Sequence, residues 1–142
     1  LDGIDNVLIH FGKCCNPIPG DEVIGFVTRG RGVTVHQSSC KSLPLLNHES
    51  DRLLQVNWNV GSSKNFNVRL KIKGQDSKGW LKDISECISK QNVNIASVDT
   101  KTKDSLVEAH FIVQVNNNRQ LNRLIRKMTK IKNIDYVERT SR

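Results

Sequence analysis

The 142-residue sequence has few aromatic residues and no long hydrophobic run. Aromatic side chains make up 5% of the residues. No apolar run approaches the ~18 to 20 residues needed to cross a bilayer, which excludes a membrane-spanning helix. The N-terminus lacks the basic and apolar segments of an export signal, and the first residue is leucine rather than methionine. These absences favour a fragment of a longer cytoplasmic protein and argue against a secreted disulfide framework.

The charge is uneven along the chain. The net charge is +8, and a hydrophobic fraction of 37% with a charged fraction of 25% is typical of a globular chain rather than a disordered one. Residues 1–60 carry five Lys/Arg against six Asp/Glu, whereas residues 61–142 carry seventeen against eight. This excess in the second part favours a polyanionic partner, with nucleic acid ahead of an acidic protein. A solvated lysine-rich surface is the alternative.

A turn-rich stretch at residues 59–65 separates two segments of different composition. Glycine and cysteine are frequent before it, and lysine and β-branched residues after it. We therefore expect two domains, 1–61 and 62–142, with the boundary near residue 62. Domains this small fold marginally without a metal, a disulfide or a partner.

The second segment predicts an α+β fold. Period-2 alternation indicates strands over 66–73 and 106–115. Further strands are expected at about 93–101 and about 134–139, with a hairpin turn at 101–104. Helical spacing of Trp80, Leu81, Ile84, Cys87 and Ile88 predicts a helix over 78–91, with Asp76 or Ser77 as its N-cap. A second helix is expected over 119–131. The order βαββαβ predicts a ferredoxin-like sheet with both helices on one face.

Two surfaces of this segment are predicted to be basic. The open face of the sheet carries Arg69, Lys71 and Lys73, together with Glu108 and His110. Because no aromatic residue is expected there, base stacking is disfavoured and phosphate contacts are expected. On the second helix, five cations share one face: Arg119, Arg123, Arg126, Lys127 and Lys130.

The first segment contains a cluster of soft metal ligands. Cys14, Cys15, His36 and Cys40 are the donor types that zinc prefers, and a Cys₃His site is one interpretation. His36 and Cys40 would share a face if a helix began there. Buried thiols without metal, or a thiol nucleophile activated by His36, are the alternatives. Cys87 lies on a helical apolar stripe and is assigned to the core.

A glycine-rich turn, Arg29-Gly30-Arg31-Gly32, places two arginines where backbone and guanidinium can approach a phosphate. An ordinary tight turn with solvated arginines is the alternative.

The stretch HFGKCCNPIPGDEVIGFVTRGRGVTVHQSSC, residues 10–40, resembles the zinc-finger-like, ribosome-contacting segment of long RelA/SpoT-type (p)ppGpp synthetases/hydrolases. The βαββαβ segment resembles the C-terminal ACT domain of the same family. The resemblance covers essentially the whole chain. It implies a small Cys/His zinc-finger-like β-rich domain followed by an ACT domain.

The resemblance implies a regulatory fragment with no catalytic residues of its own, from a GTP pyrophosphokinase that can also be a (p)ppGpp hydrolase. Its implied partners are ribosomal RNA of ribosomes carrying uncharged tRNA and the catalytic half of the same protein. It places the metal-type positions, with Zn²⁺ as the implied ion, on Cys14, Cys15, His36 and Cys40. Ser39 stands where many relatives carry an acidic residue.

The resemblance also implies an alternative function, an amino-acid-sensing ACT module that regulates by ligand binding or as a homodimer. The segment Asp76-Ser77-Lys78-Gly79-Trp80-Leu81 fits the ligand loop of such modules except at tryptophan. Asp76, Gly79, Trp80 and Leu81 are the ligand residues this implies. Gly79 would let a ligand carboxylate reach the helix N-terminus.

Overall fold

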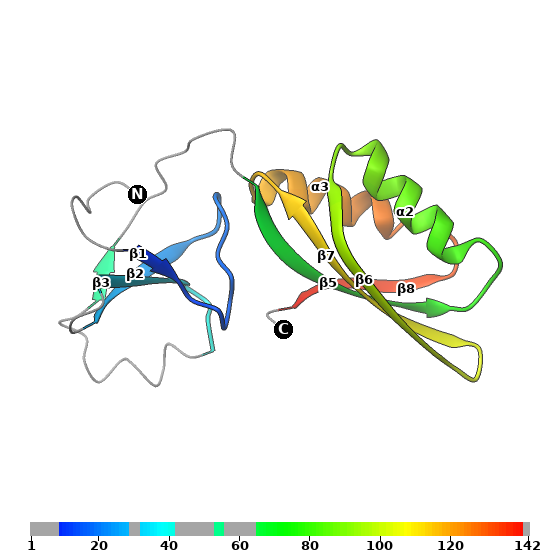
Figure 1. The fold of residues 1–142 in the computed structure, drawn as a ribbon, viewed down its shortest axis with the longest axis horizontal. Coiled ribbons are helices and arrows are strands. Elements are labelled where there is room, and N and C mark those ends of the chain that lie inside the picture. Colours follow the sequence, from blue (N-terminus) through cyan, green and yellow to red (C-terminus); the bar gives the residue numbers. More distant parts are fainter. Residues whose placement is uncertain (1–8, 29–31, 42–52, 56–64, 141–142) are drawn as a thin grey trace. The chain divides into compact units, whose positions relative to one another are not determined.

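The structure, a computed structural model, describes residues 9–28, 32–41, 53–55 and 65–140 (Figure 1). The chain divides into two compact units, Leu1–Ser63 with Ser141 and Lys64–Thr140 with Arg142. The boundary predicted near residue 62 lies outside the described residues. Within the described ranges, no helix has both the length and the apolar character needed to cross a membrane.

The first unit contains a four-stranded sheet. Its strands are β1 (Ile9–Phe11), β2 (Val23–Thr28), β3 (Gly32–Gln37) and β4 (Leu53–Gln55), in the spatial order β1-β3-β2-β4. β1 runs parallel to β3, whereas β2 pairs antiparallel with both β3 and β4. Val23, Val33 and Val35 form a small buried cluster against Ile9. Because this core is small, the unit needs another source of stability.

The second unit has the predicted βαββαβ order, and the α+β, ferredoxin-like fold is confirmed. Its elements are β5 (Phe66–Gln75), α2 (Trp80–Lys90), β6 (Asn94–Lys103), β7 (Leu106–Val115), α3 (Asn118–Met128) and β8 (Ile134–Thr140). The antiparallel sheet has the order β6-β7-β5-β8. Figure 1 shows both helices on one side of this sheet.

The core of the second unit lies between the sheet and the helices. Alternate residues of the two central strands are buried, as the period-2 pattern predicts. Leu70, Ile72 and Phe111 have no exposed surface. The helices contribute the buried side chains Trp80, Ile84, Ile88, Leu121, Leu124 and Met128. The opposite residues of the central strands therefore form the open face of the sheet.

The ends of three predicted elements are corrected by the structure. Helix α2 begins at Trp80, and its N-cap is Gly79 with φ 82°, so the predicted Asp76 or Ser77 cap is wrong. The β6–β7 turn is Asp104-Ser105, where φ is 52° and 72°, rather than 101–104. Two positive φ values are the requirement of a type I′ turn, which matches the twist of the long hairpin. Helix α3 ends at Met128, so Lys130 follows the helix.

Two side chains of α2 are less buried than the helical spacing predicts. Leu81 is 43% exposed, because the stripe that faces the sheet consists of Trp80, Ile84 and Ile88. Cys87 is half-buried at the edge of that stripe rather than in the core. It lines a hollow of about 480 Å³ between α2 and α3. Burial raises the pKa of its thiol, although Lys127 and Lys90 act in the opposite direction.

We expect Gly74→Ala to destabilise the second unit more than Gly79→Ala. A Cβ at Gly74 would collide with the backbone carbonyl of Asn133 and would lie 3.0 Å from Trp80 Nε1. Because a carbonyl cannot move as freely as a side chain, the expected cost is about 3 kcal/mol. At Gly79 no atom lies within 4 Å of the added Cβ. Only the positive φ then opposes alanine, at about 1 to 2 kcal/mol.

Urea unfolding followed at the amide resonances of β5 and β7 measures this difference between the two glycines. Equal unfolding midpoints for the two variants would show that the Asn133 loop yields to the added methyl group.

Candidate metal centre and cationic surfaces

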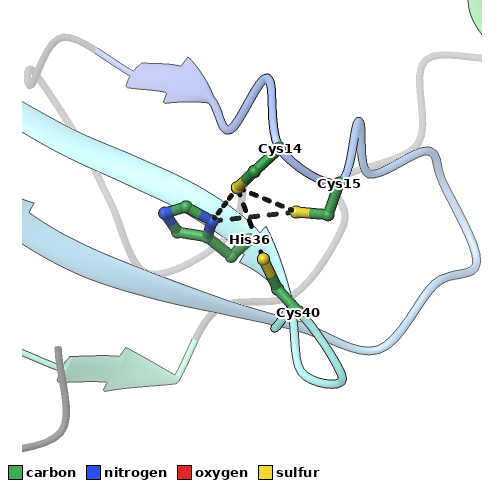
Figure 2. A group of neighbouring side chains, drawn as sticks. All are labelled: Cys14, Cys15, His36 and Cys40. Carbon is green, nitrogen blue, oxygen red and sulfur yellow. Dashed lines mark hydrogen bonds between the residues drawn. The ribbon is translucent and has the colours of Figure 1, made fainter. Parts of the chain in front are cut away.

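The four Cys/His residues of the first unit lie together (Figure 2). Cys14 and Cys15 lie in the turn after β1, whereas His36 is in β3 and Cys40 follows the turn after that strand. His36 and Cys40 are thus brought together by a strand end and a turn, not by a helix. The Cys40 N–H donates to the Gln37 carbonyl at 2.9 Å, which closes this turn.

The donor atoms of this cluster fit the geometry of a metal site. Cys14 Sγ lies 3.3 Å from His36 Nδ1, 3.3 Å from Cys40 Sγ and 4.0 Å from Cys15 Sγ. Cys15 Sγ lies 3.7 Å from His36 Nδ1. A tetrahedral ion with Zn–S about 2.3 Å and Zn–N about 2.0 Å would separate its ligands by roughly 3.5 to 3.8 Å. The four donors can therefore hold a metal ion of this class.

Burial favours the uncharged forms of Cys15 and His36 in this cluster: the protonated thiol and the neutral imidazole. Desolvation raises the pKa of the Cys15 thiol to about 12, and the neighbouring thiols of Cys40 and Cys14 act in the same direction. The Gln37 N–H, which donates to Cys15 Sγ at 3.3 Å, acts against this rise. Desolvation lowers the pKa of His36. A thiolate nucleophile paired with a charged imidazole is disfavoured here, whereas a divalent cation can replace the thiol protons.

Two further residues that sequence reasoning missed support the cluster. A Cβ on Gly12 would lie 2.6 Å from His36 Nδ1 and 2.8 Å from Cε1, so only glycine leaves room for the ring. The Gln37 side-chain amide donates to the Cys15 carbonyl, in addition to its backbone N–H on Cys15 Sγ. The position of Gly12 two residues before Cys14 could have suggested a close approach, but Gln37 carries no sequence signal.

The predicted RNA-binding cations fall on opposite faces of the second unit. Arg69, Lys71 and Lys73 lie on β5 and face away from the helices. The cationic face of α3 comprises five exposed residues that point away from its buried stripe: Arg119, Arg123, Arg126, Lys127 and Lys130. Because both helices cover the other side of the sheet, one flat contact cannot include both groups (Figure 1). Arg29 and Arg31 lie outside the described residues.

A carboxylate distinguishes the two surfaces. On the open sheet face, Glu108 Oε1 lies 3.6 Å from both Lys71 Nζ and Lys73 Nζ. Its Oε2 lies 3.0 Å from His110 Nε2. The hydrogen bond with His110 is the largest influence and lowers the pKa of Glu108; desolvation, the second largest, opposes it, and Lys71 and Lys73 lower the pKa further. Within the described ranges, no carboxylate forms an ion pair with the cationic face of α3.

The open sheet face also carries an aromatic residue, so the prediction that it lacks one is wrong. Tyr136 of β8 pairs with Lys73 in the sheet and is 38% exposed. Directly paired residues of neighbouring strands share a face, which places Tyr136 beside Lys73. A β-bulge between Lys73 and Gly74 sets this register.

The four residues implied as an amino-acid site line one hollow of about 310 Å³, together with Thr100 and Thr102. They are Asp76, Gly79, Trp80 and Leu81. Trp80 is 4% exposed, and its indole N–H donates to the Asn133 carbonyl at 3.1 Å. Its polar atom is therefore already satisfied within the protein.

The fold of the second unit, together with the comparison of the chain with known protein families, identifies this unit as an ACT domain. A model of the ACT domain family matches residues 62–139, more than half of the chain, so the chain belongs to that family. A model of the RelA/SpoT RIS domain matches residues 1–59. The predicted resemblance to RelA/SpoT proteins is thereby confirmed.

Individual relatives agree with this assignment. A GTP pyrophosphokinase of Myxococcus xanthus is 38% identical over 98% of this chain, and that of Escherichia coli K12 is 30% identical over 94%. The chain spans 18% of the length of each. The solution structure of the ACT domain from the Chlorobium tepidum GTP pyrophosphokinase matches with a TM-score of 0.50 and 29% identity. That match covers 55% of this chain and 89% of the other.

Proposed function

We propose that the chain is a non-catalytic regulatory region of a cytoplasmic GTP pyrophosphokinase of the stringent response, and that it docks on ribosomal RNA. In this proposal the first domain, 1–61, and the ACT domain, 62–142, both contact the ribosome. The region also controls the catalytic part of the same protein. The family assignment supports the regulatory role.

The observation that carries the RNA proposal is the cationic face of α3. Four of its cations lie within the eleven residues of the helix, and the fifth follows two residues after its end. All five are exposed, and none forms an ion pair within the described ranges. Cations that are not neutralised internally are free to replace the counterions of a phosphate backbone. This surface is therefore the first candidate for the contact.

In the same proposal, Zn²⁺ bound by Cys14, Cys15, His36 and Cys40 cross-links the first domain. The fit of the four donors and their burial support this role. When bound, the ion supplies a structural link between the turn after β1 and the end of β3, and no catalytic step.

Co-sedimentation with purified ribosomes over a salt series tests the RNA proposal. The salt slope is the slope of the logarithm of the binding constant against the logarithm of the salt concentration. We expect Arg123→Ala/Arg126→Ala/Lys130→Ala to reduce its magnitude by about two to three, because each lost phosphate contact lowers it by roughly 0.7 to 0.9. The matched control, Arg69→Ala/Lys71→Ala/Lys73→Ala, removes the same charge from the opposite face. Its effect is expected to be smaller, because Glu108 already neutralises two of these cations.

Arg29→Ala/Arg31→Ala tests the contribution of the glycine-rich turn in the same assay. Pelleting that does not depend on salt, or equal losses for both triple variants, would contradict docking through α3.

A second candidate function is amino-acid sensing, favoured by the hollow that Asp76, Gly79 and Leu81 line. Calorimetry of the chain against the twenty amino acids tests it. Absence of heat at millimolar concentration would remove this candidate. A saturable signal abolished by a bulky residue at Gly79 would support it, because nothing lies within 4 Å of a Cβ there.

A further inference from the structure

The open sheet face holds a network in which one carboxylate serves three nitrogen donors. Glu108 of β7 lies against Lys71 and Lys73 of β5, at 3.6 Å each, and against His110 at 3.0 Å. The side chains of Glu108, Lys71 and His110 are 28–31% exposed. All four belong to the two central strands, paired as Lys71↔His110 and Lys73↔Glu108. Their backbone positions are therefore fixed by the sheet, unlike those of an isolated surface ion pair.

The ring of His110 is oriented by this network. Its Nδ1 is buried and has no hydrogen-bond partner among the described residues. A neutral ring with its proton on Nε2 donates to Glu108 and leaves no N–H unpaired. The Nε2–H and the two ammonium groups thus point at one position, which the Glu108 carboxylate occupies.

We propose that Lys71, Lys73 and His110 form a preassembled seat for an RNA phosphate, and that Glu108 is a built-in competitor for this seat. Like the Glu108 carboxylate, a phosphate is negatively charged and has oxygen atoms that accept hydrogen bonds. The same three groups can therefore bind it. It can enter only when the Glu108 side chain turns away, since two anions at this position repel each other. This inference rests on the proposed RNA docking and assigns the open sheet face a conditional part in it.

Charge competition at one seat has a consequence for selectivity. A weak or isolated anion does not displace Glu108. An RNA already bound by the cationic face of α3, or by another part of the protein, presents its phosphates to this site at high local concentration and can displace the carboxylate. Tyr136, beside Lys73, offers an aromatic surface for a base next to that phosphate. The open sheet face would therefore add to binding only after a first contact has formed.

The test is a double-mutant cycle on the full 142-residue chain, measured by fluorescence anisotropy with a short labelled RNA over a salt series. Glu108→Gln keeps the size of the side chain and an acceptor for His110 but removes the charge. We expect RNA binding to tighten about threefold to tenfold, with a salt slope steeper by roughly one to two phosphates. In the Lys71→Ala/Lys73→Ala background, the same substitution should give no gain.

Glu22→Gln is the matched control, because it removes the same charge from an exposed residue of the first unit that belongs to neither cationic surface. A gain in RNA affinity for Glu22→Gln equal to that for Glu108→Gln would overturn the proposal, since net charge alone would explain both. A gain in RNA affinity from Glu108→Gln that persists in the Lys71→Ala/Lys73→Ala background would overturn it too. Should Glu108→Gln fail to fold, Glu108→Thr, which suits a strand, makes the same test.

A titration with tripolyphosphate, followed by NMR at β5 and β7, separates this inference from ribosome docking. Shifts at Lys71, Lys73 and His110 that are stronger in Glu108→Gln than in the unchanged chain would support the seat even if the chain does not bind ribosomes. No shifts in either protein would refute it, whatever the ribosome experiment shows. Equal binding of poly-glutamate would refute the assignment to phosphate.

Discussion

Replacing Gly12 by alanine is expected to weaken metal binding by the Cys/His cluster about 10- to 100-fold, the range found when a residue that positions a metal ligand is lost. The added Cβ would lie 2.6 Å from His36 Nδ1, the ring nitrogen that lies 3.3 Å from Cys14 Sγ. His36 is 7% exposed, and its backbone is paired with Ile24 in the β2–β3 hairpin. The ring must therefore rotate away, and the nitrogen leaves its place 3.3 Å from Cys14 Sγ.

Competition titration with a chromophoric chelator measures the affinity, and the visible spectrum of the Co²⁺-substituted protein reports the ligand set. Val35→Ala is the control, because Val35 is fully buried in the neighbouring cluster with Val23 and Val33, and the substitution keeps the backbone carbonyl that accepts from the Gly12 N–H at 2.8 Å. It should lower the stability of the unit, by about 1 to 3 kcal/mol, and leave the Co²⁺ spectrum unchanged. An unchanged affinity and spectrum in Gly12→Ala would show that His36 Nδ1 is not a ligand.

The ACT unit was largely predictable because its signals are local. Alternation along 66–73 and 106–115 identified two strands and assigned Lys71 and Glu108 to the open sheet face, as the alternating burial of β5 and β7 shows. The errors arise where glycine or backbone geometry replaces a side-chain signal. Gly79 caps α2 through its positive φ rather than through a side chain, and the Asp104-Ser105 turn adopts positive φ without glycine.

The sites were predictable in residue type but not in arrangement. Cys14, Cys15, His36 and Cys40 stand out by their chemistry, yet their contact depends on the register of β3 and on the space left at Gly12. Tyr136 was missed because the face of β8 is set by a bulge opposite it, which depends on Gly74 and the Asn133 loop. Such contacts join residues far apart in sequence, and no periodicity encodes them.

Removing Zn²⁺ from the metal-loaded chain that we propose is expected to unfold the first unit and leave the ACT unit intact. The described apolar cores of the first unit are two small clusters, and one of them is formed by Cys15 and Cys40 packed with Cys14 and Ile24. Without an ion, this second cluster loses its cross-link. Structural zinc contributes about 10 to 16 kcal/mol of apparent binding free energy in small domains, which matches or exceeds the typical stability of about 5 to 15 kcal/mol of a whole protein domain.

The measurement is the amide spectrum before and after treatment with a strong chelator, with the metal content determined in parallel. Resonances of β1 to β3 should collapse and return when Zn²⁺ is restored, whereas those of β5 to β8 serve as an internal control. The second unit has its own core from two helices and four strands, so its resonances should not move. Retention of the β1 to β3 resonances after complete metal loss would mean that the thiols pack as small hydrophobic residues. In that case the ion is not needed for the folding of this unit.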